Sequence, residues 1–124
     1  MKAFTLSLSL ACLASTVALS GCKKETRVDA TQALADSFQA AEPEARQVIQ
    51  RVNTSLKAGD VTEATRTLAP VVASRNLSQP QKQAVGVALQ QINKAIASNP
   101  ALDTKEMYEL RAKMFQAVHS GPGF

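Results

Sequence analysis

Histidine, the most common acid–base and metal-ligating side chain, occurs once in the sequence, as His119. Its imidazole could serve as a general base or, together with Met114, as a ligand of a haem iron. A catalytic histidine needs an orienting carboxylate, but Phe115 and Gln116 occupy the positions one helical turn earlier. The residue also falls at the end of the last predicted helix, where a cation is favoured by the helix dipole. We therefore predict a helix-end role for His119 and no bound cofactor.

The carboxylates form three small clusters, which are Glu42/Glu44, Asp60/Glu63 and Asp103/Glu106/Glu109. A hydrolase that works by general acid and base catalysis needs two carboxyl groups that face each other across a cleft. These clusters instead fall at the starts of predicted helices, where negative charge is favourable. The sequence also lacks a Gly-x-Ser-x-Gly motif and a glycine-rich phosphate loop. These patterns predict that the protein is not an enzyme.

The charge of the chain argues against a nucleic-acid partner. The whole sequence has 14 Lys and Arg against 10 Asp and Glu. Residues 28–124 hold ten basic and nine acidic residues, a net charge of +1, so the basic excess lies near the N-terminus. Nucleic-acid binding needs a basic stripe on the folded domain. We therefore expect no nucleic-acid interface.

The first 22 residues carry the most specific pattern. Lys2 precedes residues 3–19, which have no charge but are short for a membrane span of about 20 apolar residues. The string Leu19-Ser20-Gly21-Cys22 follows this stretch and resembles the lipobox of bacterial lipoprotein precursors. The resemblance implies cleavage between Gly21 and Cys22, a diacylglycerol on the Cys22 thiol and acylation of the new amine. Residues 1–21 are thus predicted to be a lipoprotein signal peptide.

The resemblance also predicts where the protein lies. Residues 22–28 form a short basic tether that contains Lys23, Lys24 and Arg27. In lipoproteins of bacteria with two membranes, Asp after the lipidated cysteine favours the inner membrane, and this chain has Lys23 instead. We expect anchoring in the periplasmic leaflet of the outer membrane, or on the outer face of the cell membrane if the host has one membrane. Because Cys12 leaves with the signal peptide, the remaining single thiol permits neither a Cys/His metal cluster nor an internal disulfide.

The rest of the chain has helical spacing, and we predict an all-α bundle of four to five antiparallel helices over residues 29–119. Four candidate N-caps precede a Glu or Gln by three residues, namely Asp29/Gln32, Asp60/Glu63, Ser78/Gln81 and Asp103/Glu106. Apolar stripes define the expected helices 29–58, 61–75, 79–98 and 104–119. Met107 and Met114, seven residues apart, are expected to pack in the core rather than bind a metal. Residues 120–124 are expected to form a flexible tail.

Two prolines interrupt this pattern. One narrow apolar stripe continues through Pro43, which either kinks a single helix over 29–58 or opens a second helix as its first residue. The continuity of the stripe favours the kinked helix. Pro70 poses the same question within 61–75, where Leu68, Val71 and Val72 are expected to face the core.

The turn at Gly59 carries a second resemblance. The run Ala58-Gly59-Asp60, followed by Glu63-Ala64 and Leu68, is similar to the inter-helix turn of tetratricopeptide repeats. No period of 34 residues recurs, so the resemblance covers one helical hairpin at most.

Two classes of function remain open from the sequence. The first is a lipid-anchored, non-catalytic helical module that docks onto another envelope protein or assembly. The second is a bundle that holds a lipid or another small apolar molecule between its helices, with Pro43, Pro70 and Gly86 loosening the packing. Glutamine is common on the predicted outer faces, which suits solvation or polar contact with a partner or glycan. We favour the interaction module.

Overall fold

The apolar stripes of the sequence become the buried faces of five α-helices. The structure, a computed structural model, describes residues 29–121. The helices are α1 (Ala30–Ser37), α2 (Pro43–Lys57), α3 (Val61–Ala73), α4 (Gln79–Ser98) and α5 (Lys105–His119), with a short 3₁₀ helix, η1 (Pro100–Leu102), before α5. No strand occurs within residues 29–121. The predicted all-α class, with four to five helices, is therefore confirmed.

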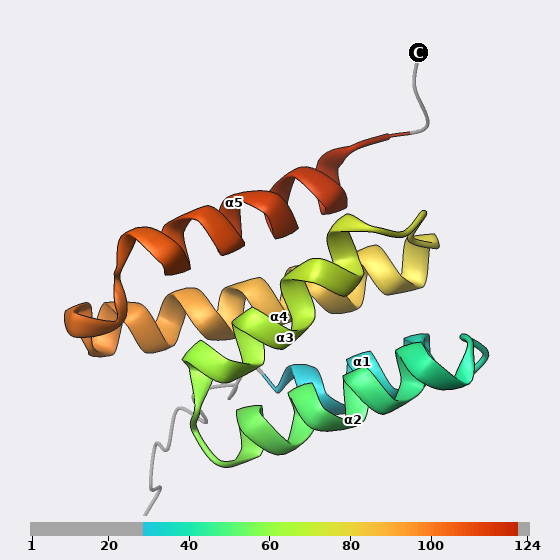
Figure 1. Ribbon diagram of the computed structural model, residues 1–124, viewed down its shortest axis with the longest axis horizontal. Helices are drawn as coiled ribbons and strands as arrows, with labels where there is room; N and C mark the ends of the chain where they lie inside the picture. Colours follow the sequence, from blue (N-terminus) through green and yellow to red (C-terminus); the bar gives the residue numbers. More distant parts are fainter. Residues whose placement is uncertain (1–28, 122–124) are drawn as a thin grey trace, which may run out of the picture.

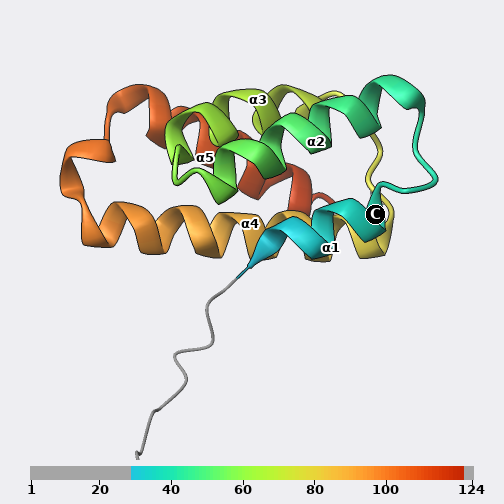
Figure 2. The ribbon, with the colours of Figure 1, turned by 90° about the horizontal axis from the view of Figure 1, so that it is seen from below.

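Neighbouring helices close a ring in the order α1, α2, α3, α5, α4. Consecutive helices run in opposite directions along the chain, as the colours of Figure 1 show. A ring of five helices cannot alternate in direction throughout, so one neighbouring pair must be parallel, and that pair is α3 and α5. Seen from below, α1 lies against α4 along one edge of the bundle, with α2 and α3 beside each other above them (Figure 2).

The core inside this ring is almost entirely apolar. The largest fully buried side chains come from all five helices and the turn after α1, namely Phe38, Leu34, Leu68, Ile92, Met107, Met114, Val52, Val72, Val85 and Thr65. Thr65 satisfies its hydroxyl by donating a hydrogen bond of 2.7 Å to the carbonyl oxygen of Val61. The buried positions of Met107 and Met114 confirm their predicted role in the core. Packing of these side chains is the main source of stability in a bundle of this size.

The chain breaks between α1 and α2, so the prediction of one kinked helix over residues 29–58 was wrong. Phe38 ends α1, and its amide donates to the carbonyl oxygen of Leu34 at 3.1 Å. Pro43 is the first residue of α2 and holds Glu42 in an extended conformation, with φ −55° and ψ 150°. Both halves of the stripe still reach the core because α2 folds back against α1.

The second proline does not break its helix. α3 continues through Pro70 to Ala73, and Leu68 and Val72 are buried while Val71 is half-buried. Pro70 removes the amide that would bond the carbonyl of Arg66 one turn earlier. Both residues lie on the exposed side of α3, so that carbonyl faces solvent. Because water can bond this carbonyl, the free-energy cost of the missing hydrogen bond is reduced.

The helix starts match the predicted capping chemistry at three of four positions. Ser78 and Gln81 form a complete capping box at α4, and the Asp60 carboxylate accepts from the amide of Glu63 at α3. Asp29 caps α1, but it accepts from Thr31 rather than closing a box with Gln32. Hydrogen bonds from the side chain and the amide of Thr31 hold the pKa of Asp29 below its ordinary value.

The predicted cap at Asp103 was wrong. Thr104 is the N-cap of α5, and its hydroxyl oxygen accepts from the amide of Met107 at 3.2 Å. The Asp103 carboxylate instead accepts a charged hydrogen bond of 2.6 Å from Arg111. α5 follows the short helix η1 and begins one residue later than expected, and no pattern in the sequence predicted η1.

Two side chains fasten the first turn of α1 to its neighbours. The amide of Ala30 donates to the side-chain oxygen of Gln91 in α4 at 2.9 Å. The side-chain amide of Asn53 in α2 donates to the carbonyl oxygen of Thr31 at 2.9 Å. These two bonds join the shortest α-helix to both of its partners in the ring.

Two glycines make a matched test of backbone conformation. Gly59 turns the α2–α3 hairpin with φ +77°, whereas Gly86 lies inside α4, and an added Cβ would meet nothing within 4 Å at either position. We expect Gly59→Ala to destabilise the protein by about 1–2 kcal/mol, because the left-handed conformation is strained for alanine. Gly86→Ala should stabilise it by about 0.8–1 kcal/mol through helix propensity. Urea denaturation followed by circular dichroism measures both values, and equal signs for the two variants would contradict the assignment.

Candidate functional site

A groove of about 710 Å³ runs between α4 and α5 on the outside of the bundle. Gly86 and Ala112 are among its lining residues, so small side chains lie on both walls. Leu89 and Val118 add apolar surface. The groove therefore exists because α4 and α5 are neighbours whose facing side chains do not fill the space between them.

Two aromatic side chains of α5 line this groove and are exposed. Tyr108 is 66% exposed and Phe115 is 57% exposed, and they are the exposed large hydrophobic residues within residues 29–121. They are seven residues apart, which places them two turns apart on the same side of the helix. Neither residue is required to fill the interior. They are available for contact with another molecule.

The ring of Phe115 stacks on the ring of His119, with centroids 3.9 Å apart and an angle of 27° between the planes. His119 is exposed in the last turn of α5, and its Nδ1 lies 2.9 Å from the carbonyl oxygen of Phe115. The imidazole thus contacts its own helix and faces no described carboxylate. The structure gives it the helix-end position predicted from the sequence.

Polar side chains with no net negative charge surround the aromatic pair. Five amide side chains line the groove, namely Gln79, Gln83, Gln90, Asn93 and Gln116. Lys82 and Arg111 are the charged residues among the lining side chains, and no Asp or Glu lines it. The groove therefore offers apolar surface, neutral hydrogen-bonding groups and positive charge.

The two cations of the groove differ in how their charge is compensated. The guanidinium of Arg111 donates to Asp103 at 2.6 Å and to the Asn93 side chain at 2.8 Å. Lys82 donates to the carbonyl oxygen of Ser120 at 2.6 Å, beyond the end of α5. Its charge is therefore bonded to a neutral acceptor, whereas that of Arg111 is neutralised by a carboxylate.

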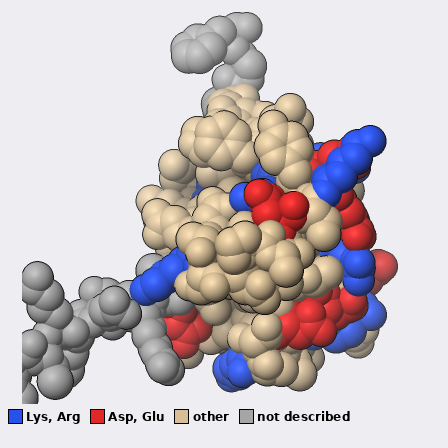
Figure 3. All heavy atoms as spheres, turned by 90° about the vertical axis from the view of Figure 1, so that its left-hand side faces the viewer, with Lys and Arg blue, Asp and Glu red and all other residues tan. Residues whose placement is uncertain are grey.

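The charged side chains are distributed unevenly over the end of the bundle where η1 lies. Figure 3 shows the end of the bundle where η1 lies, with more acidic and basic side chains at the right of the view than at its upper left.

The acidic clusters predicted from the sequence mostly form ion pairs, namely Glu42 with Arg75, Asp103 with Arg111, Glu106 with Arg66 and Glu109 with Lys105. Residues 29–121 contain no group of three or more His, Cys, Asp or Glu side chains placed to hold a metal ion.

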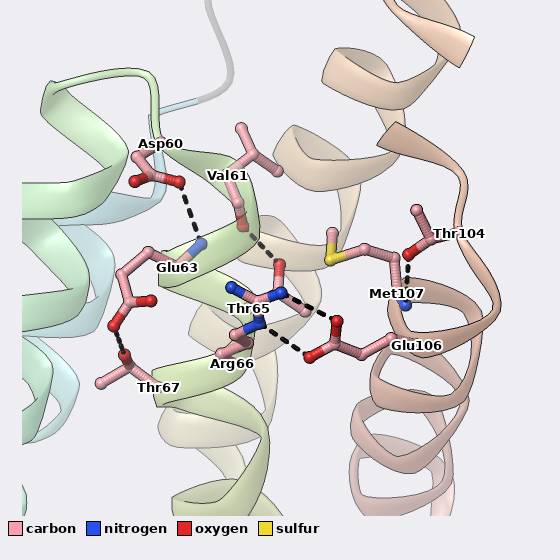
Figure 4. A network of polar contacts seen from close by, with 9 residues as sticks. All are labelled: Asp60, Val61, Glu63, Thr65, Arg66, Thr67, Thr104, Glu106 and Met107. Carbon is pink, nitrogen blue, oxygen red and sulfur yellow. Dashed lines mark hydrogen bonds and ion pairs between the residues drawn. The ribbon is translucent and has the colours of Figure 1, made fainter. Parts of the chain in front are cut away.

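The best formed of these ion pairs joins the parallel helices α3 and α5. Arg66 donates from Nε to one oxygen of Glu106 at 2.7 Å and from its terminal nitrogen to the other oxygen at 2.8 Å (Figure 4). Hydrogen bonding to Arg66 lowers the pKa of the Glu106 carboxyl and raises that of the guanidinium. Nearby, Asp60 caps α3, and Glu63 accepts from the hydroxyl of Thr67 (Figure 4). The Arg66–Glu106 pair thus fastens α3 to α5, while the other contacts stabilise the first turns of α3.

The Arg66–Glu106 pair makes stability depend on pH in the acidic range. Because the folded-state pKa of Glu106 is lowered, the folded protein binds this proton less readily than the unfolded chain. The stabilisation is complete above the ordinary carboxyl pKa of 4.5 and is lost as the pH falls through the lowered folded-state value. We expect Glu106→Gln to lower the melting temperature at pH 7 and to leave it unchanged at the acidic end, near pH 2.

Thermal melts at several pH values and two salt concentrations measure this difference. Both side chains of the pair are half exposed, so high salt should also reduce the difference in melting temperature between wild type and Glu106→Gln. The exposed Glu44→Gln is the matched control, because Glu44 lies on the surface of α2 and forms no ion pair within the described residues. A gap between wild type and Glu106→Gln that persists undiminished at acidic pH would contradict the assignment.

The sequence patterns did not identify the groove. Tyr108 and Phe115 stand next to the buried stripe of Met107 and Met114, and periodicity alone does not separate a core flank from an exposed face. The one available signal was the position of Gly86 inside α4, where a missing side chain leaves space. Which helix faces α4 across that space is decided by the ring order.

The lipidation site predicted at Cys22, and the cleavage position after Gly21, lie outside the described residues. No helix within residues 29–121 is long and apolar enough to span a bilayer.

Comparison with known proteins identifies no relative. No protein-family model, no curated protein and no solved structure matches the chain significantly. The class of protein is therefore given by its fold alone, a small all-helical bundle with an open groove between two of its helices. The resemblances to lipoprotein precursors and to a tetratricopeptide hairpin stay predictions.

Proposed function

We propose that the protein is a lipid-anchored, non-catalytic interaction module of the bacterial envelope, which binds another envelope protein through the α4–α5 groove. The observation that carries the docking role is the pair of exposed aromatic side chains, Tyr108 and Phe115, on one wall of that groove. The lipid anchor rests on the lipobox-like string that ends at Cys22. The expected location is the periplasmic leaflet of an outer membrane, or the outer face of the cell membrane in a host with one membrane.

Exposed aromatic residues support the docking role on energetic grounds. A large aromatic side chain contributes most when it is desolvated in a well-packed interface, and Tyr and Trp are common among residues that dominate binding energy. Tyr108 keeps a hydroxyl that can donate a hydrogen bond at such an interface. The surrounding amides fit the polar rim of an interface.

Binding of a small apolar ligand is the second candidate. A volume of about 710 Å³ falls in the range of about 300–1,000 Å³ that is common for ligand pockets. The groove is open to solvent, however, and Pro43 and Pro70 do not line it. Gly86 alone among the three residues expected to loosen the packing lies on its wall. The open shape favours a macromolecular partner over an enclosed ligand.

Site-specific cross-linking in living cells tests the proposal. A photo-reactive phenylalanine analogue replaces Phe115 in the groove, and the same analogue at exposed Gln47 in α2 serves as the matched control. We expect one envelope protein to be captured from position 115, not from position 47, and to be lost when Cys22→Ser mislocalises the bundle. Capture from both positions alike, or a lipid in place of a protein at position 115, would contradict the docking module.

A further inference from the structure

The α4–α5 groove is long enough to bind one additional helix of three to four turns. Its lining spans Gln79 to Asn93 on α4 and Tyr108 to His119 on α5, which corresponds to roughly 21 Å and 16 Å at 1.5 Å per residue. These lengths equal about three to four helical turns. The two helices are antiparallel neighbours joined through η1, so they form two walls along which a third helix can pack.

The aromatic spacing fits a helical occupant. Tyr108 and Phe115 are two turns apart on α5, and a docked amphipathic helix presents apolar side chains at the same interval, at positions i, i+3 or i+4, and i+7. Gly86 and Ala112 leave room between the walls for such side chains. The glutamines of the rim can donate or accept hydrogen bonds and so do not select the sign of the partner's charge.

The positive charge of the groove favours a partner with negative charge. Lys82 and Arg111 line it without any Asp or Glu, and only Arg111 is neutralised by a carboxylate among the described residues. A second copy of this chain would bring Lys82 toward another positively charged groove, which disfavours self-association through this face. An occupant with carboxylates beside its apolar stripe would complement Lys82.

We propose that the α4–α5 groove binds an acidic amphipathic helix of a partner protein. This inference rests on the proposed docking function and adds the chemistry of the partner. The apolar stripe of that helix packs between Tyr108 and Phe115, and its carboxylates lie near Lys82 at the end of the groove where α4 begins. The same docking mode is widespread where an amphipathic helix fills an apolar groove.

Designed peptides provide the test. The protein is purified from cells, placed in nanodiscs of neutral lipid, and titrated with two 18-residue helical peptides that share one leucine stripe but carry Glu or Lys on the other faces. We expect the acidic peptide to bind at least about tenfold more tightly than the basic peptide. Empty nanodiscs measure peptide binding to lipid. Equal affinity for both peptides, or no binding of the acidic peptide at millimolar concentration, would overturn the inference.

Matched variants locate the binding. Lys82→Glu should weaken the acidic peptide about tenfold, while Lys113→Glu, the same change on the exposed surface of α5 outside the groove, should leave its affinity within about twofold. Phe115→Ala should weaken the peptide by about tenfold or more without altering the helical content. An equal effect of Lys82→Glu and Lys113→Glu would show that net charge alone attracts the peptide.

The inference and the proposed function fail in different experiments. If position 115 cross-links to an envelope protein in cells but the acidic peptide does not bind, the docking function stands and the acidic helix is excluded. If oleate displaces the peptide and binds more tightly, with the same dependence on Lys82 and Phe115, the occupant is an anionic lipid and both proposals are overturned.

Discussion

Phe38→Ala is expected to destabilise the protein by about 3–5 kcal/mol. Phe38 is 1% exposed and is the largest side chain of the core. It is the C-cap of α1 and part of the core cluster, so its removal leaves a cavity in the core. A domain of this size has a total stability of about 5–15 kcal/mol, and the loss removes a large part of it.

Phe115→Ala is the matched control for this prediction. The same substitution at a side chain that is 57% exposed should change the free energy of unfolding by about 0.5 kcal/mol or less. Urea denaturation followed by circular dichroism gives both values. If the two variants lost similar stability, Phe38 would not be the core side chain that its burial indicates.

Cys22→Ser is expected to abolish the uptake of palmitate almost completely and to change the location of the protein. A thioether to diacylglycerol needs a thiol, and the resemblance to lipoprotein precursors places that thiol at Cys22. Each buried methylene contributes about 0.8 kcal/mol, so two or three acyl chains anchor the wild type firmly, and the variant has none of them. Labelling of cells with radioactive palmitate, followed by membrane fractionation, measures both the lipid and the location.

Cys12→Ser supplies the control, because Cys12 lies in the stretch that is predicted to leave with the signal peptide. This variant should take up palmitate and fractionate with membranes as the wild type does. Palmitate uptake by Cys22→Ser at the wild-type level would refute the anchor and the proposed location together.

Helices defined by both a cap and a stripe were predictable from the sequence. Ser78 and Gln81 begin α4, Asn99 ends it, and the predicted range 79–98 equals the observed helix. Local chemistry determines such ends, since a capping side chain and its amide lie within four residues of each other. The stripe of Val85 and Ile92 then faces inward in any bundle.

Helix ends at which two local structures are both compatible with the sequence were not predictable. A continuous stripe through Pro43 fits both a kinked helix and a helical hairpin, and the choice depends on whether α2 can pack against α1 and α3 at once. Asp103 and Thr104 could both cap α5; in the structure Thr104 is the cap, and Asp103 bonds Arg111 two turns later. The spacing of residues in the sequence does not reveal which of two possible hydrogen-bond partners a side chain takes.

The candidate groove depended on tertiary order in the same way. Tyr108 and Phe115 form a candidate binding surface only because α5 lies between α3 and α4 and the side of α5 that carries them stays uncovered. No motif in the sequence encodes this order. The predicted lipid anchor, in contrast, rests on a linear motif, the string that ends at Cys22, and needs no knowledge of the tertiary order.

The attachment of α1 has a mechanical consequence. If Cys22 is anchored as proposed, tension between the membrane and a bound partner enters the bundle at Ala30. The first bonds loaded are then those from Ala30 to Gln91 and from Asn53 to Thr31. Gln91 belongs to α4, and its neighbour Gln90 lines the groove. In that case a pull from the membrane would reach α4, the helix that forms one wall of the groove.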